Sequence, residues 1–340
     1  MIRIPFEDMK STIAQAFTRA GMPADRASTC ASIHTESSRD GVSSHGLNRV
    51  ERFVDYIHRG WVDVNANPQL HKNLGALEIY NGHMGPGILN ARFAMNRATE
   101  IAAQHGLGLV SLFNTTHWMR GGAYGWQAAD KGYIGICWTN TESCMPAWGA
   151  KSGGIGNNPF IMAVPRKEGH MVLDMAMSQY SYGKLNSTKL KQEKLPYPGG
   201  FDDNGILTDD PEAIENSRQI LPMGYWKGSG FAIMLDVIAS LLSGGLTTAG
   251  IDKCDKGSCG SCCQVFIAIN PTLINTQEFI DNAIGETIRQ VQSSVPVKEN
   301  ASIYYPGEQS LKNREESRQL GIPADEGVWR TVQSLAKIIP

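Results

Sequence analysis

Residues 43–49 combine a possible proton donor with a possible ligand for a carboxylate. We expect Ser43 or Ser44 to cap a helix and His45 to lie in or near its first turn. Arg49, four residues later, would then lie on the same helix face. Histidine titrates near neutral pH and can protonate a developing alkoxide, while arginine binds a carboxylate through two parallel hydrogen bonds. The alternative is that both residues simply lie on a solvated helix face.

A second candidate segment, residues 114–122, contains His117, Trp118 and two adjacent glycines. It follows an apolar run predicted to be a strand and precedes a predicted helix, and ligand sites in α/β sheets lie at such strand ends. His117 could therefore hydrogen-bond a substrate oxygen. In the alternative interpretation the segment is a turn whose Trp118 fills the edge of the core.

Lys227 lies among glycines in a third segment, residues 221–230, just before a predicted helix. Helix N-termini and nearby lysines attract anions such as phosphate. A flexible loop with a solvated lysine is the alternative. Residues 303–309 suggest only a strand, a turn and the start of a helix.

Four of the seven cysteines lie within ten residues, at Cys254, Cys259, Cys262 and Cys263. Four thiolates could hold a zinc ion, but this spacing does not match a standard zinc motif and no histidine is near. We therefore expect loop thiols and no metal site. An odd cysteine count without a regular framework indicates reduced thiols and a cytoplasmic protein.

The composition is that of a globular protein of 340 residues with a formal net charge of −2. This charge gives no reason to expect a nucleic acid as partner. The strongest apolar stretch, residues 231–246, is too short to span a bilayer, so no membrane association is expected. The first residues carry no basic segment followed by an apolar run, so no signal peptide is expected.

Hydrophobic periodicity predicts helices at both ends of the chain and alternating strands and helices between them. Leu47, Val50, Val54 and Ile57 have the spacing of a buried helix face, and Gly60 would end that helix. The other predicted helices are 6–19, 24–37, 90–104, 123–131, one from Phe231 onward, and helical sequence from 308. The predicted strands are 107–113, 134–139, 160–164, 171–175 and 265–269. Residues 192–210, 222–230 and 247–261 are predicted loops.

This order predicts an α/β protein with a mixed sheet and a largely helical domain formed by both chain ends. We expect residues 1–105 and 308–340 to form the helical substrate and dimer domain, and residues 106–307 to form the cofactor domain. No G-x-G-x-x-G fingerprint links a strand to a helix, so a Rossmann unit is not expected.

Three segments resemble the type-2 malate/L-lactate dehydrogenase family: Ser44-His45-Gly46, HWMRGGAYGWQ at 117–127 and LPMGYWKGSG at 221–230. The resemblance implies a non-Rossmann NAD(P)-binding fold and a homodimer whose active site lies between domains. It also implies that His45 is the catalytic proton donor and that Ser44, Arg49 and His117 contact the substrate. The implied cofactor-binding residues are His170, Met171, Val172, Leu173, Asp174, Met175, Ala176, Trp226, Lys227, Gly307, Glu308 and Gln309. Glu308-Gln309 stands where the family pattern has a His-Glu pair.

The function expected from these features is NADH-dependent reduction of a 2-keto acid, namely 2,3-diketo-L-gulonate to 3-keto-L-gulonate. Hydride from the nicotinamide would attack the carbonyl carbon, and His45 would protonate the oxygen. NADPH is the alternative cofactor. Alternative substrates within the same chemistry are malate, lactate, sulfolactate, ureidoglycolate or a cyclic imine acid. A non-catalytic NAD-binding protein and a metal-binding protein are the alternatives outside it.

Overall fold

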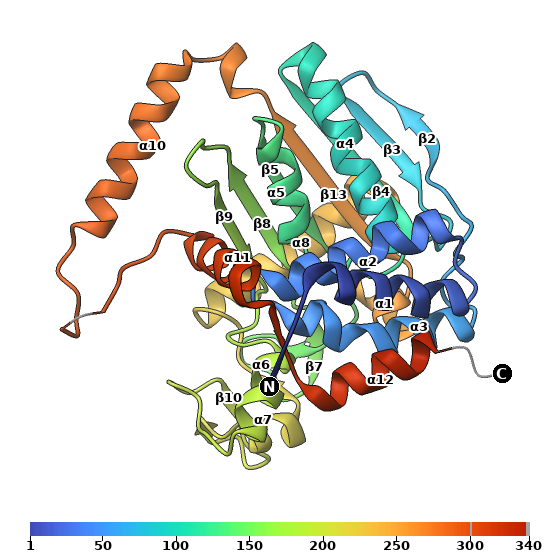
Figure 1. Ribbon diagram of the computed structural model, residues 1–340, viewed down its shortest axis with the longest axis vertical. Coiled ribbons are helices and arrows are strands. Elements are labelled where there is room, and N and C mark those ends of the chain that lie inside the picture. The colour runs from blue at the N-terminus through green and yellow to red at the C-terminus, as the bar shows by residue number, and fades with distance from the viewer. Residues whose placement is uncertain (300, 338–340) are drawn as a thin grey trace.

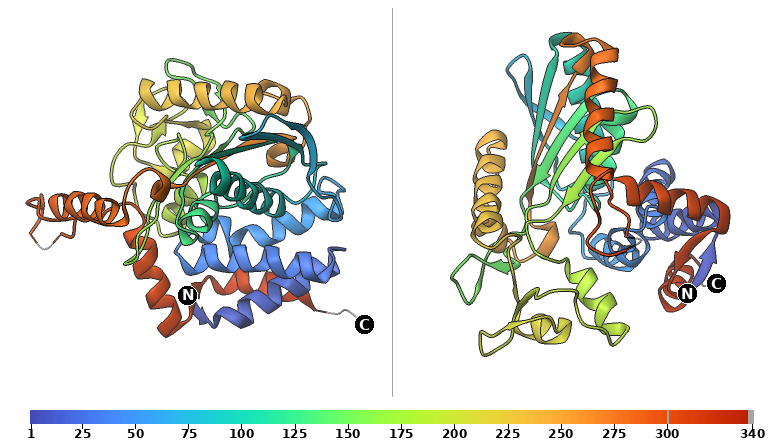
Figure 2. Two further views of the ribbon diagram at one scale, coloured as in Figure 1. Left: turned by 90° about the horizontal axis from the view of Figure 1, so that it is seen from above. Right: turned by 90° about the vertical axis from the view of Figure 1, so that its left-hand side faces the viewer.

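The computed structural model describes residues 1–299 and 301–337, and its centre is a mixed seven-stranded sheet covered by helices on both faces (Figures 1 and 2). Only β3 and β4 pair in parallel, and every other neighbouring pair is antiparallel. In spatial order the strands are β2 (Gln69–Asn73), β3 (Leu77–Asn81), β4 (Leu107–Thr115), β13 (Cys262–Ile269), β5 (Ile134–Thr139), β8 (Phe160–Val164) and β9 (Met171–Met175).

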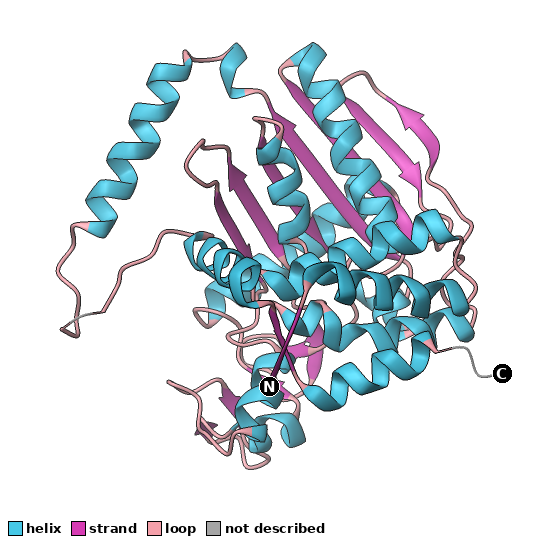
Figure 3. Cartoon of the chain, in the orientation of Figure 1, coloured by secondary structure: helices cyan, strands magenta, loops and turns pink. Residues whose placement is uncertain are grey.

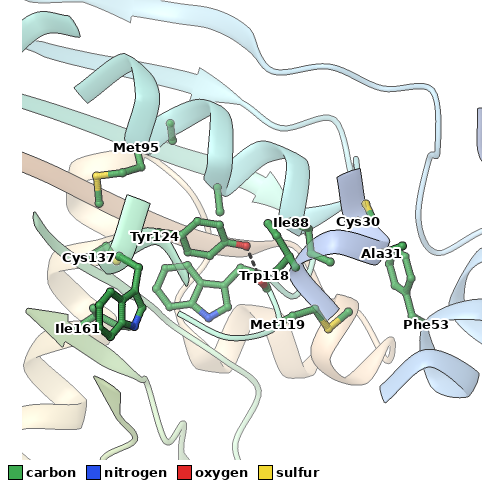
Figure 4. Packing of buried hydrophobic residues seen from close by; sticks show 14 of the residues in the cluster. Cys30, Ala31, Phe53, Ile88, Met95, Trp118, Met119, Tyr124, Cys137 and Ile161 are labelled. Carbon is green, nitrogen blue, oxygen red and sulfur yellow. Dashed lines mark hydrogen bonds between the residues drawn. The ribbon is translucent and has the colours of Figure 1, made fainter. Parts of the chain in front are cut away.

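Helices α4 (Gly87–His105) and α5 (Gly122–Asp130) cover one face of this sheet, and α8 (Trp226–Ser243) covers the other (Figure 2). Successive side chains of β13 point to opposite faces of the sheet and so contribute to two hydrophobic clusters. Phe266 and Ala268 pack in the larger cluster, and Cys263 and Val265 pack in the smaller one. In the larger cluster Trp118, Tyr124 and Met95 pack closely (Figure 4), and the Tyr124 hydroxyl donates to the Trp118 carbonyl oxygen at 2.6 Å.

Both chain ends build a helical layer beside the sheet (Figure 3), as predicted. Its strands β1 (Ile2–Ile4) and β14 (Ile322–Ala324) pair antiparallel and tie the two ends together. Its helices are α1 (Phe6–Arg19), α2 (Ala24–Arg39), α3 (Val50–His58), α11 (Glu308–Leu320) and α12 (Glu326–Ala336). The division into residues 1–105 with 308–340 and residues 106–307 stays a prediction. Strands β2 and β3 and helix α4 precede residue 106 and belong to the sheet layers.

The short elements lie in the connections. They are η1 (Ser43–His45), η2 (Leu47–Arg49), β6 (Met145–Pro146), β7 (Gly153–Ile155), α6 (Tyr182–Leu190), β10 (Gly200–Phe201), β11 (Leu207–Thr208), α7 (Pro211–Ser217), β12 (Gln219–Ile220), α9 (Thr248–Asp252), η3 (Gly257–Cys259) and η4 (Pro271–Leu273). Helix α10 (Gln277–Gln292), which the sequence analysis did not predict, projects away from the body (Figure 1). None of the helices within the described range has the length and apolar character needed to cross a membrane.

Most of the predicted elements are confirmed. Strands 134–139, 160–164 and 171–175 and helix 6–19 have the predicted bounds. The strands predicted at 107–113 and 265–269 are longer by a few residues, and the predicted helices 24–37, 90–104 and 123–131 shift by three residues or fewer. Periodic side-chain burial therefore located the elements of the sheet and of the helical layer.

The single helix predicted to carry both His45 and Arg49 is wrong. His45 ends the 3₁₀ turn η1, Arg49 ends a separate turn η2, and α3 begins only at Val50. Gly46 separates them with φ −114° and ψ −121°, values outside the helical region. Neither serine caps the turn, whose N-cap is Val42 without a side-chain hydrogen bond. The predicted buried face is confirmed, because Leu47, Val50, Val54 and Ile57 are each at most 8% exposed.

Two predicted loops also contain helices. Helix α8 starts inside the predicted loop 222–230, so Lys227 lies in its first turn. The predicted loop 247–261 contains α9 and η3, and Tyr56 of α3 anchors η3 through a 3.1 Å hydrogen bond between its hydroxyl and Ser258 Oγ. Glycine-rich composition suggested loops in both segments, but packing against the sheet and α3 holds them in helical turns.

Gly46 lies directly on α2, which generates a test of the turn. A Cβ at this position would lie 2.2 Å from Ser38 Oγ and 2.7 Å from the carbonyl oxygen of His34. We expect Gly46→Ala to lower the free energy of unfolding by about 1–3 kcal/mol, measured by urea denaturation. The control is Gly153→Ala, whose added Cβ meets no atom within 4 Å. Equal stability of the two variants would contradict this account of the turn.

Candidate active site

Helix α2 holds the Ser44-His45-Gly46 turn in place through two buried polar side chains. His34 Nδ1 lies 3.0 Å from the Gly46 carbonyl oxygen, and Ser38 Oγ accepts the Leu47 N–H at 2.8 Å. Because a carbonyl can only accept, the His34 proton lies on Nδ1. The Ser44 hydroxyl in turn lies 3.1 Å from His45 Nδ1, so the other ring nitrogen of His45 is the one that a ligand can reach.

Asp40 ties this turn to two distant segments. Its carboxylate, 3% exposed, pairs with Arg120 Nη1 at 2.8 Å and with Arg314 Nε and Nη2 at 3.0 and 2.9 Å. Arg39 Nε lies 2.9 Å from the same carboxylate. Burial pushes the Asp40 pKa up, but the Arg314 hydrogen bonds and the charges of Arg120 and Arg39 outweigh burial and lower it. The residue that precedes the His45 turn is therefore anchored to the His117 loop and to α11.

The His117 ring stacks on the His45 ring, with centroids 5.7 Å apart and planes inclined by 22°. The Met119 N–H donates to His117 Nδ1 at 2.9 Å, which places the proton of the neutral ring on Nε2. Arg49 Nη2 lies 3.4 Å from this Nε2. Since both nitrogens then carry a hydrogen, this contact is no hydrogen bond, and the two donors lie close enough together for one acceptor atom to contact both. A substrate oxygen placed there would satisfy both.

Both histidines are neutral in the free protein at pH 7. Burial, followed by the charges of Arg49 and Arg120, lowers the His45 pKa to about 3. Burial and the Arg49 charge likewise hold the His117 pKa well below its usual value of 6.5. Burial, with Arg52 nearby, also lowers the Arg49 pKa. A ligand that brings negative charge to Arg49 would weaken this effect and favour protonation of His45.

Two residues that the sequence analysis did not select complete the surroundings of Arg49. Glu142 follows β5, and its charge partly opposes the lowering of the Arg49 pKa by burial. Burial raises the Glu142 pKa, and its Oε2 is buried without a hydrogen-bond partner, as is Arg49 Nε. Cys259 is 1% exposed, and its thiol interacts with the His117 backbone. The rule that selected His117, a polar residue after a sheet strand, would also have selected Glu142.

The loop of Glu142 is tied to the His45 turn through α6. Tyr182 donates its hydroxyl hydrogen to the Cys144 carbonyl oxygen at 2.8 Å. The next residue, Gly183, lies so close to Ser44 that a Cβ on it would be 2.6 Å from the Ser44 Cβ. The site is therefore assembled from the His45 turn, the His117 loop, the Glu142 loop and η3.

The predicted cofactor segment 170–176 forms the sheet edge at β9. The Val172 N–H points outward to the Pro306 carbonyl oxygen at 2.9 Å, and by strand alternation the Asp174 backbone also points outward. Gly307, with φ +95°, begins α11 against this edge, where a Cβ would lie 2.9 Å from the Val172 nitrogen. Residues 306 and 307 of the chain thus occupy this edge at Val172, and the outward backbone groups of Asp174 are the ones that an extended dinucleotide could contact.

The other predicted cofactor residues lie at the two ends of β9. Residues 221–223 run beside 177–179, with the Met223 N–H donating to the Met177 carbonyl oxygen at 2.7 Å, and Trp226 and Lys227 follow at the start of α8. Both are exposed. Gly307 lies at the opposite end, and Glu308 and Gln309 follow it in α11.

Several of these side chains are already engaged within the chain. His170 bonds Asp130 through Nε2 at 3.0 Å, and Asp174 accepts from Arg120 Nε at 3.2 Å. Glu308 pairs with Lys312, and Gln309 with Asn313.

The cysteine cluster does not converge on a point. Cys254 Sγ lies 3.6 Å from the Gly250 carbonyl oxygen, and Cys262 Sγ lies 3.8 Å from that of Ser258. Cys263 Sγ instead contacts the Leu246 carbonyl oxygen at 3.2 Å. Across residues 1–299 and 301–337, no group of three or more His, Cys, Asp or Glu side chains could hold a metal ion. All seven cysteines are free thiols.

Comparisons with known proteins agree over nearly the whole chain. A family model described as malate/L-lactate dehydrogenase matches residues 4–333. The chain is 42% and 43% identical to 2,3-diketo-L-gulonate reductases of Citrobacter koseri and Escherichia coli O127:H6, over 98% of this chain and 100% of each relative. Malate dehydrogenase of Pyrococcus horikoshii OT3 superposes with a TM-score of 0.89 at 27% identity, over 98% of this chain and 94% of that one. Sulfolactate dehydrogenase of Methanocaldococcus jannaschii gives 0.88 at 25%, over 98% and 96%.

The buried neutral histidines predict how the free energy of unfolding depends on pH. In the folded protein the pKa is lowered to about 4 in His34, to about 3 in His45 and well below 6.5 in His117. Below pH 6.5 the unfolded chain therefore binds more protons than the folded protein does. The free energy of unfolding, measured by urea denaturation, should therefore fall from about pH 7 to about 5.5. His117→Asn should reduce this slope by up to about one proton.

Three carboxylates add their own pH dependence to that of the histidines. Glu36 and Glu142 have raised pKa values and would add stability at more acidic pH, while Asp40, with a lowered pKa, would lose it there. A free energy of unfolding that stays constant through the window would contradict the neutral, buried state of these rings.

Proposed function

Because this chain belongs to the malate/L-lactate dehydrogenase family, we propose that it reduces 2,3-diketo-L-gulonate to 3-keto-L-gulonate with NADH. The relatives of that name, at 42% and 43% identity over the whole of their length, support this substrate. The observation that carries the proposal is the convergence of Arg49 Nη2 and His117 Nε2 beside the His45 ring. Malate, lactate, sulfolactate and ureidoglycolate remain the alternative substrates within this chemistry.

Three side chains divide the work on the substrate. Arg49 holds the carboxylate and so fixes the position of the neighbouring carbonyl group. His117 donates its Nε2 hydrogen to a substrate oxygen, because the Met119 N–H holds the ring in that tautomer. His45 delivers the proton that the carbonyl oxygen needs when it becomes an alkoxide. Its low pKa in the free protein makes protonation depend on the negative charge that the substrate brings.

The surroundings of Arg49 favour a hydroxylated substrate. The unpartnered Glu142 Oε2 can only accept a hydrogen bond when ionised, whereas Arg49 and His117 only donate. A ligand that satisfies all three must both accept and donate. A keto acid with hydroxyl groups does so, and pyruvate does not, which supports 2,3-diketo-L-gulonate over smaller substrates.

NADH supplies the hydride when bound. The outward backbone groups of Asp174 would contact it along the edge of β9, and Lys227 would attract a phosphate group. These assignments make NADH the proposed cofactor and NADPH its alternative. Free thiols throughout the chain support a reducing compartment, and we propose the cytoplasm.

A substrate panel with a matched pair of variants tests the reaction. Purified protein should oxidise NADH on addition of 2,3-diketo-L-gulonate, more efficiently than with oxaloacetate, pyruvate or sulfopyruvate. His45→Ala should lower kcat by about 10²-fold or more, since it removes the proton donor, without changing NADH affinity measured by fluorescence. His58→Ala, at an exposed position in the last turn of α3, is the control. Undiminished turnover in His45→Ala, or no oxidation with any keto acid, would refute the proposal.

We also propose a homodimer, supported by the apolar outer face of α8. Met234 is 54% exposed and Leu241 76%, while Ala232, Leu235 and Ala239 of the same helix pack against the sheet. Exposed apolar faces of this kind mark protein contacts.

The dimer proposal is tested by solution mass. Light scattering should give twice the chain mass of 37.1 kDa for the unmodified protein. The double variant Met234→Asp/Leu241→Asp should be monomeric, because it buries charge in the contact. Leu320→Asp, which changes an exposed leucine of α11, should remain dimeric. A dimer that persists in the double variant would place the contact elsewhere.

A further inference from the structure

A cavity of about 430 Å³ lies between α2, α4, α5 and α11, outside the proposed active site. In Figure 1, α4 and α5 lie against the sheet and α2 and α11 belong to the helical layer. Its volume falls in the range of small-molecule sites. The residues that line it include none of those assigned above to the substrate or cofactor.

Positive side chains dominate the lining of this cavity. The charged lining residues are Arg39, Arg92, Arg120, Lys131 and Arg314, and against them Glu36, Asp40 and Asp130. Five cationic groups against three acidic groups leave a formal excess of two positive charges. Asn96 and Gln127 add amide groups, and Trp126 and Ala123 add apolar surface.

The acidic groups do not cancel this excess locally. Asp40 is shared by three arginines, so the arginines outnumber it at the floor of the cavity. Asp130 bonds His170 instead of any cation of the cavity. Glu36 remains, and burial, the largest influence on it, raises its pKa in spite of the arginines around it.

Two cations at the mouth are available for a ligand. Arg92 of α4 is exposed, and within the described part of the chain it forms no ion pair. Lys131 contacts only neutral oxygens, with Nζ 2.7 Å from Asn96 Oδ1 and 3.4 Å from Thr99 Oγ1. A ligand with two or more anionic groups could reach these cations and the buried arginines at once.

We propose that this cavity binds a small polyanion, a molecule with two or more carboxylate or phosphate groups, at a site separate from the active site. Arginine forks favour planar carboxylate and phosphate groups over halide ions. The volume admits a compact molecule, and the apolar surface of Trp126 and Ala123 would cover its carbon skeleton.

Calorimetric titration of the full chain with citrate and, separately, pyrophosphate tests the proposal. At least one probe should bind saturably below about 1 mM, and the comparison of the two distinguishes carboxylate from phosphate preference. Arg92→Glu should weaken that binding by about tenfold or more, because it removes a charged hydrogen bond and adds repulsion. Arg19→Glu, at the exposed end of α1, is the charge-matched control and should bind as the unmodified protein does.

A variant of the proposed active site separates the two sites. Arg49→Gln should leave citrate and pyrophosphate binding unchanged, whatever it does to turnover, because Arg49 does not line the cavity. Loss of binding in Arg49→Gln, equal effects of Arg92→Glu and Arg19→Glu, or no saturable binding of either probe would overturn the proposal. None of these outcomes depends on the reductase activity.

Discussion

The arrangement of the site depends on one buried carboxylate, Asp40, and the arginines that surround it. Asp40 ends α2 immediately before the His45 turn, Arg120 belongs to the His117 loop, and Arg314 belongs to α11. The three segments lie far apart in the sequence: α2 and α11 belong to the helical layer, and the His117 loop follows a strand of the sheet. A buried charge is stable only when it is paired, so loss of any one partner would leave the others uncompensated. The His45 turn, the His117 loop and the start of α11 are therefore held together by a single network.

Burial, together with nearby arginines, explains why the site contains two neutral imidazoles among positive groups. Arg49, Arg52 and Arg120 all lie near the ring pair, and burial removes the water that would otherwise screen them. The free protein therefore carries an excess of positive charge at the site. A negatively charged ligand would offset these charges, so its binding would favour protonation of His45. In the reaction proposed above, the charge of the substrate would thereby help to protonate His45.

Much of the fold could be predicted from the sequence, because strands and helices that bury one face carry that period in their residues. Strand 134–139 and helix 6–19 are examples. The break at Gly46 could not be predicted, since it depends on His34 and Ser38 of another helix. Helix α10 was not predicted. Ile288 is its one buried residue, so its periodic apolar side chains do not pack in the core.

For the candidate site, the sequence predicted the hydrogen-bond donors His45, Arg49 and His117 but did not predict the acceptor Glu142. His45, Arg49 and His117 stand in short motifs whose residue types suggest chemistry, and the structure brings all three together even though the predicted helix does not exist. Glu142 follows β5 outside any motif, and only the general rule that ligand sites lie after sheet strands would have selected it. Its role is suggested by its Oε2, which is buried without a hydrogen-bond partner, and by the charge of Arg49 acting on it. Both features arise only when the chain folds. Local spacing can therefore suggest the reaction, whereas the choice of substrate follows from residues that only the fold brings together.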